Sequence, residues 1–451
     1  MRGKTVLWLG NLLLILMVTL NGHYAYDLTP LWLGIVLLGA YSSFLAVAGG
    51  RRSDRNTTGE NLHSNLPAEQ PFVTLLVPAK NEARVVARAM RELADLEYAT
   101  SEGPQFEVIA VDDGSEDDTY GELVRLAERI PNLRAVRRDR GALPGKSAVL
   151  NDALPLARGA VIGVFDADAR VAPDFLWRTL PLLLQEGVGA VQAQKRISNA
   201  RPLGLLSGLP LRQALRWVFH LPLLQDIEML MDTACQTARS KGRGAVDLRG
   251  NGLLVKRSVL LSVGGWNNET LTDDLDLATR LQVAGSRVVF APEATVGEEG
   301  VRTWPALFHQ RRRWVEGSIR RYLDYGGDLV RADIPLASKA DALIFVAEFA
   351  LPMWLFFSLA VWLVSQAFGL YYDPVVSYAI AFGHLAITLP FILTVTWRHV
   401  TRHPLLYPLV VLALSVYLLH WLPVIIWTVL RLVVLRPQRR WAKTEHVGGA
   451  T

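Results

Sequence analysis

Two pairs of aspartates stand directly after two apolar, β-prone runs of the sequence. Asp112 and Asp113 follow one run, and Asp166 and Asp168 follow another. Carboxylate oxygens without His or Cys beside them suit a hard cation such as Mg²⁺ or Mn²⁺, and Mg²⁺ is often held by carboxylates together with substrate phosphates. Either pair alone could be only a helix N-cap or a turn. Two pairs at two strand ends favour a site where a metal ion bridges the protein to a negatively charged diphosphate.

Other chemistries find little support in the sequence. No GxxxxGK[ST] motif is present and no GxGxxG follows a predicted strand, which argues against a nucleoside triphosphatase or a dehydrogenase. The single cysteine, Cys235, excludes a disulfide scaffold and a Cys-based zinc or iron–sulfur site. Arg outnumbers Lys by 39 to 8, and Arg stays charged when it is partly buried.

The elements that must position the aspartates follow from the hydrophobic pattern. Apolar β-prone runs alternate with helix-like segments, which predicts an α/β domain with a mainly parallel sheet and helices on both faces. In such sheets ligands bind outside the carboxyl ends of the strands, where both aspartate pairs lie. The predicted strands are residues 72–78, 106–111, 133–136 and 160–165, and the predicted helices are residues 83–96, 116–130, 148–157 and 275–283.

The aspartates belong to a series of short motifs whose order resembles the inverting family 2 glycosyltransferases. The last two motifs of the series are similar to the TED and QxxRW motifs of membrane-embedded members, such as the cellulose, hyaluronan and poly-N-acetylglucosamine synthases and the glucosyltransferases that act on diacylglycerol. The resemblance covers roughly residues 72–325 and implies a GT-A fold. The motifs are Val-Pro78-Ala-Lys-Asn81-Glu82, Val-Asp112-Asp113-Gly-Ser, Gly145-Lys146-Ser-Ala-Val-Leu-Asn151, Phe-Asp166-Ala-Asp168, Thr272-Asp273-Asp274 and Gln310-Arg-Arg-Arg313-Trp314.

The resemblance implies a nucleotide pocket near the start of the domain. Asp113, with Asp112 beside it, would contact the uridine half of a UDP-sugar. Pro78, Asn81 and Glu82 would line the same pocket.

The resemblance also implies the reacting groups. Asp168 would hold Mg²⁺ or Mn²⁺ on the diphosphate, with Asp166 assisting towards the nucleotide or the sugar, and Lys146 would reach the nucleotide or its phosphates. Asp274 would be the general base that activates an acceptor hydroxyl. Asp273 stands where the family has Glu, which keeps the charge but shortens the reach.

A helix-like segment after residue 303 carries the last group of candidates. Arg313 offers a planar fork that matches phosphate oxygens, and Trp314 offers a flat apolar face for a sugar ring or a lipid. Gln310 completes the motif for diphosphate or acceptor binding. Taken alone, the segment could equally be a basic interfacial helix. Taken alone, Lys146 could be a surface lysine, and the two aspartates at 273–274 could only compensate a helix N-terminus.

The 451-residue chain is 51% hydrophobic and 20% charged, which is too apolar for one soluble domain and too charged for a chain that lies wholly in a membrane. Five nearly uncharged runs occupy residues 6–20, 31–48, 342–368, 374–397 and 404–430. Spanning a bilayer takes about 17–25 residues, which the first run does not reach. That run could be a signal peptide, and the last three could be buried core helices.

These runs predict the organisation of the whole chain. The predicted parts are two transmembrane helices in residues 1–50, a linker in residues 51–70, a GT-A domain with interfacial helices in residues 71–330, about three transmembrane or re-entrant helices in residues 331–435 and a basic tail in residues 436–451.

Basic residues predict the orientation in the membrane. Arg2 and Lys4 precede the first run, and Arg51 and Arg52 follow the second. Both flanks therefore read as cytoplasmic, and we expect an integral, multi-pass membrane protein whose catalytic domain lies on the cytosolic side. The number of C-terminal crossings stays open, because one run could be re-entrant or the last run could bend at Pro423.

Three functions remain open. The first is transfer of one sugar, glucose by preference, from a UDP-sugar to a membrane lipid, diacylglycerol by preference, with inversion to a β-linkage. Gln310–Gly317 favours it, being similar to the motif of the diacylglycerol-specific members. The second is a processive β-polysaccharide synthase with the same active site. The third is a catalytically dead membrane scaffold, which the complete set of charged positions disfavours.

The expected partners are a UDP-sugar, a membrane lipid acceptor and the lipid bilayer, and no nucleic acid is expected. Residues 203–231 and 304–331 mix Leu with Arg and Trp. They could lie at the membrane surface close to the base, although an ordinary core helix explains the first stretch equally well. The sequence does not predict the oligomeric state.

Overall fold

A computed structural model of the chain describes residues 70–100, 103–139, 141–200, 210–370 and 406–434, together with residue 37 and residues 39–41, 43–48, 388–390 and 392–397. The apolar run predicted at residues 6–20, the linker as far as residue 69 and the basic tail predicted at 436–451 lie outside these ranges.

One eight-stranded sheet forms the centre of the α/β part, with the strand order β5-β4-β1-β6-β9-β8-β10-β7. Strands β5, β4, β1 and β6 pair in parallel, as do β8 and β10, whereas β9 and β7 pair antiparallel with their neighbours. The strands of this sheet are β1 Val73–Ala79, β4 Phe106–Asp112, β5 Leu133–Arg137, β6 Val161–Val164, β7 Arg170–Val171, β8 Val188–Ile197, β9 Leu253–Lys256 and β10 Arg287–Glu298. A separate two-stranded hairpin joins β2 Ala99–Thr100 to β3 Gly103–Pro104.

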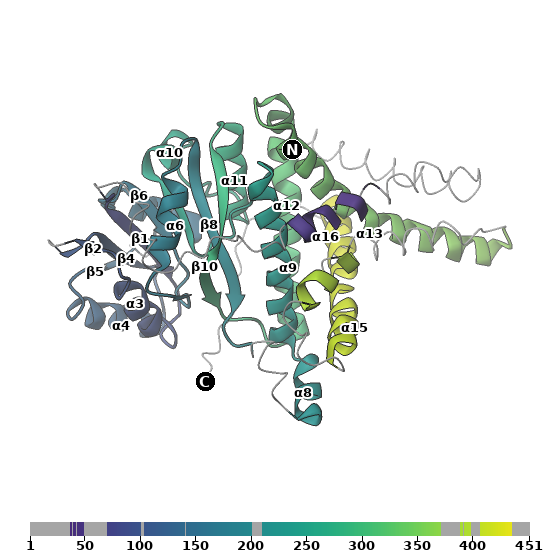
Figure 1. Ribbon diagram of the computed structural model, residues 1–451, viewed down its shortest axis with the longest axis horizontal. Helices are drawn as coiled ribbons and strands as arrows, with labels where there is room; N and C mark the ends of the chain where they lie inside the picture. The colour runs from purple at the N-terminus through teal and green to yellow at the C-terminus, as the bar shows by residue number, and fades with distance from the viewer. Residues whose placement is uncertain are drawn as a thin grey trace.

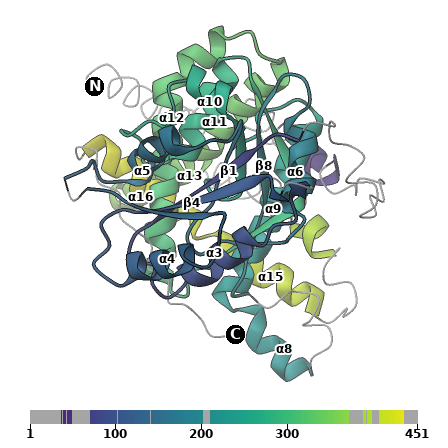
Figure 2. The ribbon, with the colours of Figure 1, turned by 90° about the vertical axis from the view of Figure 1, so that its left-hand side faces the viewer.

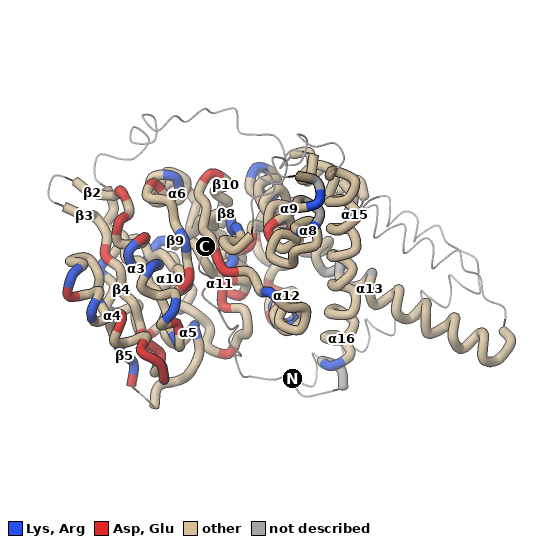
Figure 3. Tube along the Cα trace, turned by 90° about the horizontal axis from the view of Figure 1, so that it is seen from below, with Lys and Arg blue, Asp and Glu red and all other residues tan. Residues whose placement is uncertain are grey.

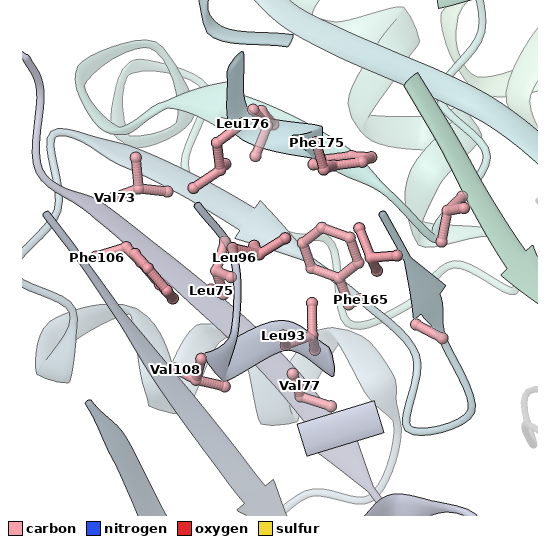
Figure 4. Close-up of a cluster of buried hydrophobic side chains, with 14 of the residues drawn as sticks. Val73, Leu75, Val77, Leu93, Leu96, Phe106, Val108, Phe165, Phe175 and Leu176 are labelled. Atoms are coloured by element: carbon pink, nitrogen blue, oxygen red, sulfur yellow. The ribbon is translucent and has the colours of Figure 1, made fainter. Parts of the chain in front are cut away.

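Helices cover both faces of the sheet, as the strand–helix alternation predicts (Figure 2). Alternate side chains of a strand point to opposite faces. Val73, Leu75 and Val77 of β1 accordingly join the core beneath α3 and α6 (Figure 4), whereas Leu76 joins the core beneath α5 and α11. The helices of this part are α3 Val86–Ala94, α4 Thr119–Ala127, α5 Lys146–Ala153 with the 3₁₀ turn Leu154–Leu156, α6 Phe175–Leu183, α10 Arg257–Ser262 and α11 Asp273–Val283.

The predicted elements of this part are confirmed, with ends that differ by a few residues. The prediction lacked both antiparallel strands, β7 and β9, and also the parallel pair β8 and β10. The mixed sheet arises because β9 runs between two strands that are parallel to each other, β6 and β8. The carboxyl ends of β4, β1, β6, β8 and β10 consequently share one edge of the sheet.

A second layer of helices lies against the far side of the α/β part (Figure 1). Helix α9 packs on the sheet and, with α8, against α15, and α12 packs between α11 and α16. Charged residues gather on the α/β part, whereas α13, α15 and α16 are almost free of them (Figure 3). The helices of this layer are α8 Leu211–Val218, α9 Leu221–Lys241, α12 Trp304–Arg331, α13 Leu336–Phe368, α15 Leu406–Leu418 and α16 Trp421–Val434.

The first half of α9 is buried along its whole surface from Leu221 to Leu230, so this part of the predicted interfacial stretch is a core helix. The short helix α8 before it has several exposed residues. Residues 201–209 lie outside the described part.

Among the described residues, one helical stretch is long and apolar enough to cross a membrane, Leu406–Leu432. The other apolar helices found there are shorter: Gly39–Ala48, Pro352–Phe368 and Thr388–Trp397. The long stretch is interrupted at residues 419–420, where the bonds from Leu419 N to Val416 O and from His420 N to Tyr417 O span only three residues. Pro423, which lacks an N–H, cannot donate to the carbonyl four residues earlier, and this explains the interruption.

Candidate active site

One cavity of about 590 Å³ opens along the shared carboxyl edge of the strands and continues between α9, α11, α12, α13 and α16. It collects most of the residues singled out in the sequence, although they are spread over more than 230 positions of the chain. The predicted site residues that line it are Pro78, Glu82, Asp113, Lys146, Asp166, Asp168, Asp273, Asp274, Gln310, Arg313 and Trp314. The two remaining ones, Asn81 and Asp112, are not among its lining residues.

Asn81 and Asp112 hold the loops that shape the nucleotide end of the cavity. Asn81 adopts a left-handed conformation with φ 53°. Its N–H donates to Ser115 Oγ at 2.9 Å, and its Oδ1 accepts from Glu116 N at 2.8 Å. The buried Asp112 carboxylate accepts from Ser115 N at 3.3 Å. Asn81 therefore ties the loop after β1 to the loop after β4, and Asp112 fixes the loop after β4 to the end of its own strand.

Asp113 faces the cavity and is held by two cations. The buried guanidinium of Arg138 forms an ion pair with one carboxylate oxygen, and Lys80 Nζ lies 3.5 Å from the other. Arg138 is in turn paired with Asp152 at 2.6 Å. The sequence analysis gave no role to Lys80, which lies inside the first motif, or to Arg138, which lies outside all of the motifs.

Lys146 is the first residue of α5 and points across the sheet edge. Its Nζ donates to Asp166 Oδ1 at 2.6 Å and to the Gly250 carbonyl oxygen at 2.9 Å. Burial alone would lower the pKa of Lys146, but the carboxylates of Asp166, Asp273 and Asp274 raise it above its ordinary value. Lys146 is therefore a permanently charged cation at the centre of the acidic cluster, and not a surface lysine.

Asp168 is buried, and its Oδ2 accepts from the backbone N–H of Glu299 at 2.8 Å. Among the described residues, no three Asp, Glu, His or Cys side chains are grouped tightly enough to hold a metal ion by themselves. Mg²⁺ usually completes its shell with water and substrate phosphates, so two carboxylates are a sufficient protein contribution. The hard oxygen donors of Asp166 and Asp168 fit such a cation in a cavity large enough for a diphosphate.

Asp273 and Asp274 are the first two residues of α11 and face the same cavity. Burial raises the pKa of Asp273 to about 6, with Lys146 opposing this shift and Asp274 adding to it. Burial also raises the pKa of Asp274, although Oδ1 of that residue accepts from Leu275 N at 2.8 Å. A carboxylate poised near neutral pH is suited to accept a proton from a substrate.

Helix α12 brings the last motif against these carboxylates. Burial lowers the pKa of Arg313, and the charges of Asp274, Asp166 and Asp273, which line the same cavity, oppose that shift. The neighbouring Arg311 lies with its guanidinium carbon 4.0 Å from the centre of the Trp314 ring. The Gln310–Trp314 segment is thus packed inside the molecule and not only laid on its surface.

Sequence reasoning missed seven charged residues that line the cavity, Lys80, Lys195, Glu228, Asp232, Arg249, Glu298 and Glu299, and four of them form two ion pairs. Lys195 Nζ lies 2.5 Å from Glu298 Oε2, and Arg249 Nη2 lies 2.5 Å from Asp232 Oδ1. Lys195 and Glu298 lie near the carboxyl ends of β8 and β10, so the rule that found the aspartates would have found them had those strands been predicted. Asp232 and Arg249 carry no comparable signal, because a charged pair across a helix and a loop becomes visible only in the fold.

Part of the cavity wall is apolar. The side chains there come from the four helices α9, α13, α15 and α16. They include Met231 of α9, Phe345, Phe349 and Pro352 of α13, Leu418 of α15 and Trp421, Leu422 and Ile425 of α16. The same cavity therefore joins a charged end to an apolar end.

The site and the fold can now be compared with known proteins. Residues 70–317 match the family described as "Glycosyltransferase like family 2". The chain belongs to this family and is a glycosyltransferase with an α/β fold of the GT-A type.

Two relatives are similar over most of the chain. The β-monoglucosyldiacylglycerol synthase of Trichormus variabilis is 35% identical over 461 aligned positions, which cover 99% of this chain and 89% of the relative. The protein of the same name from Synechocystis sp. is 36% identical over 389 positions, which cover 84% of this chain and 76% of the relative. A solved mannosyltransferase from Pyrobaculum calidifontis in complex with GDP-Man and Mn²⁺ has a TM-score of 0.53 at 22% identity, over 86% of this chain and 98% of that one. This last likeness shows the fold alone.

Proposed function

We propose that the protein transfers glucose from UDP-glucose to diacylglycerol with inversion, and so makes a β-glucosyl diacylglycerol. The observation that carries the proposal is the single cavity in which buried carboxylates and an apolar wall meet. The names of the relatives supply the sugar and the lipid. Their similarity reaches beyond residue 317 and includes the apolar helices.

The nucleotide-sugar occupies the strand-edge end of the cavity. Asp113 accepts from the uracil or ribose of UDP, and Pro78 and Glu82 form the wall beside it. Asp112 and Asn81 do not contact the nucleotide but hold in place the loops that surround it. Their hydrogen bonds to Ser115 and Glu116 support this indirect role.

The diphosphate lies between Lys146, Arg313 and the Asp166–Asp168 pair. Asp168 and Asp166 would hold Mg²⁺ or Mn²⁺, which when bound neutralises negative charge on the leaving diphosphate. Lys146 and Arg313 place two further cations at the same point, and such preorganised charges stabilise a leaving group without reorganisation. Gln310 and Trp314 border the acceptor.

Asp274 is the general base. The acceptor hydroxyl loses its proton to Asp274 while its oxygen attacks the anomeric carbon of glucose from the face opposite UDP. The bond from that carbon to the UDP oxygen breaks with its electron pair, so an α-linked donor gives a β-linked product. Asp273 stays beside the base and tunes its pKa. A positioned base of this kind contributes about 10²–10⁴-fold to the rate.

The protein is an integral, multi-pass membrane protein in this proposal, with helices at both ends and residues 71–330 on the cytosolic side. The stretch Leu406–Leu432 and the shorter apolar helices around Gly39–Ala48, Pro352–Phe368 and Thr388–Trp397 support membrane contact. The basic residues that flank the first two apolar runs support the orientation.

The test uses the full chain in nanodiscs, with labelled UDP-glucose, Mg²⁺ and diacylglycerol. One β-glucosyl lipid on thin-layer chromatography, cleaved by a β-glucosidase, is the expected product. High-molecular-weight material that stays at the origin would replace the proposal by a β-polysaccharide synthase. Absence of UDP release with every donor offered would favour a scaffold.

A further inference from the structure

The apolar end of the cavity is larger than the acceptor hydroxyl requires. We propose that it is a subsite for an acyl chain of the acceptor lipid, lined by α9, α13, α15 and α16. This inference rests on the proposed function and adds to it the place of the lipid chain and the residues that set its length.

The charged and the apolar residues line one continuous cavity. Asp274 and Ile425 line it, and so do Trp314 and Trp421. An amphiphile with a hydroxyl at one end and a hydrocarbon chain at the other can therefore place its hydroxyl at the base while its chain follows the apolar wall. A water-soluble acceptor would leave this wall unused.

Phe349, Pro352, Leu422 and Ile425 on this wall offer carbon surface and no side-chain hydrogen-bonding groups. A growing β-glycan would carry several hydroxyls past these residues, and each hydroxyl buried without a partner weakens binding by about 5- to 150-fold. A hydrocarbon chain pays no such cost, and each buried methylene improves binding by about 0.8 kcal/mol, or about fourfold.

The Glu228 carboxylate on this wall is already engaged by hydrogen bonds. The Glu228 carboxylate accepts from Arg311 Nη2 at 2.5 Å, from Tyr417 Oη at 2.6 Å and from Trp421 Nε1 at 2.9 Å. These donors come from α12, α15 and α16, so one buried carboxylate joins four helices around the subsite. It stiffens the wall and leaves the chain an apolar path.

The outer faces of the lining helices indicate how a lipid reaches the subsite. The faces of the same helices that point away from the cavity are also apolar and exposed, as at Leu343, Leu363 and Val416. Such faces suit contact with a bilayer. A lipid can then reach the cavity from the membrane, with its second chain remaining among the bilayer lipids.

The experiment changes the size of the subsite without touching the charged end. Ile425→Trp and Leu422→Trp fill it from α16, and Ile425→Ala enlarges it. Val416→Trp is the matched control, because Val416 is an exposed apolar residue of the adjacent helix and does not line the cavity. Each full-length variant is assayed in nanodiscs with diacylglycerols of increasing chain length.

For the unchanged protein and for Val416→Trp, the KM for diacylglycerol should fall with chain length and then level off. In Ile425→Trp and Leu422→Trp, the KM for diacylglycerol should stop falling at a shorter chain length. Their KM for long-chain diacylglycerols should therefore be at least tenfold higher than that of the unchanged protein. The KM for UDP-glucose and for the shortest acceptor should change less than twofold. Ile425→Ala should move the levelling point to longer chains.

Two results would overturn the subsite. One is the same chain-length profile in the filled variants and in Val416→Trp. The other is a uniform loss of kcat for every acceptor with no change in the profile. If the unchanged protein glucosylates no diacylglycerol, the proposed function fails separately. Binding of the fluorescent fatty acid cis-parinaric acid then tests the subsite proposal. Equal affinity for this probe in Ile425→Trp, Leu422→Trp and Val416→Trp would refute it.

Discussion

Gly317 of α12 lies directly against Thr272, the residue that precedes α11. A Cβ atom placed on Gly317 would lie 2.3 Å from both Oγ1 and Cγ2 of Thr272. Helices α11 and α12 can approach this closely only because position 317 has no side chain. The approach sets the distance between Asp273 and Asp274, which begin α11, and Arg313 and Trp314 on α12.

We expect Gly317→Ala to lower kcat/KM by about 10²-fold, because a displacement of about 1 Å between catalytic groups can cost that much. The extra methyl group must separate the two helices. Steady-state kinetics of the nanodisc-embedded variant measures the effect. Thr272→Ala in the same chain removes two of the three contacting atoms and should restore part of the activity.

Gly326→Ala and Gly327→Ala are the matched controls on the same helix. A Cβ at Gly326 meets nothing within 4 Å, and one at Gly327 meets only Arg331 Nη1 at 3.9 Å. Both changes should leave activity intact and stabilise the helix by up to about 1 kcal/mol. Equal losses in all three alanine variants would show that helix contact at Gly317 is not what matters.

Asp274→Asn should abolish glucosyl transfer and leave UDP binding nearly intact. The amide has almost the shape of the carboxylate but cannot take the proton of the acceptor hydroxyl. Isothermal titration with UDP and Mg²⁺ checks binding, and lipid-product formation checks transfer. Substantial turnover in this variant would remove Asp274 from the role of base.

The rate should depend on pH through the Asp273–Asp274 pair. Burial raises the pKa of Asp273 to about 6 and raises that of Asp274 as well. A base works only when it is deprotonated, so kcat/KM should fall as the pH drops through about 6 and level off above it. The apparent pKa belongs to the pair, because the two carboxylates interact.

Asp273→Asn separates the two groups in this pH profile. Removing the negative charge of Asp273 makes ionisation of Asp274 easier. The fall of kcat/KM at low pH should therefore occur at a lower pH in Asp273→Asn than in the unchanged protein. A profile that is identical in the two proteins would mean that another group limits the rate.

Activity should require a divalent cation and should be lost in Asp168→Ala. A chelator should abolish turnover, and Mg²⁺ or Mn²⁺ should restore it, because Asp168 and Asp166 carry hard oxygen donors beside the diphosphate end. UDP binding provides a second readout, since added cation should tighten it in the unchanged protein only. Full turnover in the chelator would refute metal dependence.

The pair formed by Glu228 and Arg311 gives a prediction about stability. Both groups are buried, and their nearest side-chain atoms lie 2.5 Å apart. Glu228→Gln leaves the Arg311 charge without its counter-ion, which costs about 3–5 kcal/mol in buried pairs. Thermal unfolding in detergent should show a lower midpoint for Glu228→Gln. Adding Arg311→Met should recover part of the loss, whereas additive losses would mean that the two charges do not interact.

The sequence was sufficient to predict strands β1, β4, β5 and β6 and the reacting edge at their carboxyl ends. The strand-forming runs that end at Asp112 and Asp166 predict both the strand and the position of the carboxylate at its end. They do so because local periodicity and parallel pairing are properties of short segments. The motif order around Lys146, Asp274 and Arg313 extended this prediction to one site, and the cavity does bring these residues together.

Only the tertiary structure decided which residues reach the cavity and which support it from behind. Asp112 and Asn81 lie in the same motifs as Asp113 and Glu82, yet their side chains hold loops. Glu228, Asp232 and Arg249 carry no local signal, because their partners are supplied by other helices and loops. Sequence periodicity reports the conformation of neighbouring residues, whereas the close contact of Gly317 with Thr272 and the meeting of charged and apolar walls depend on how whole elements pack.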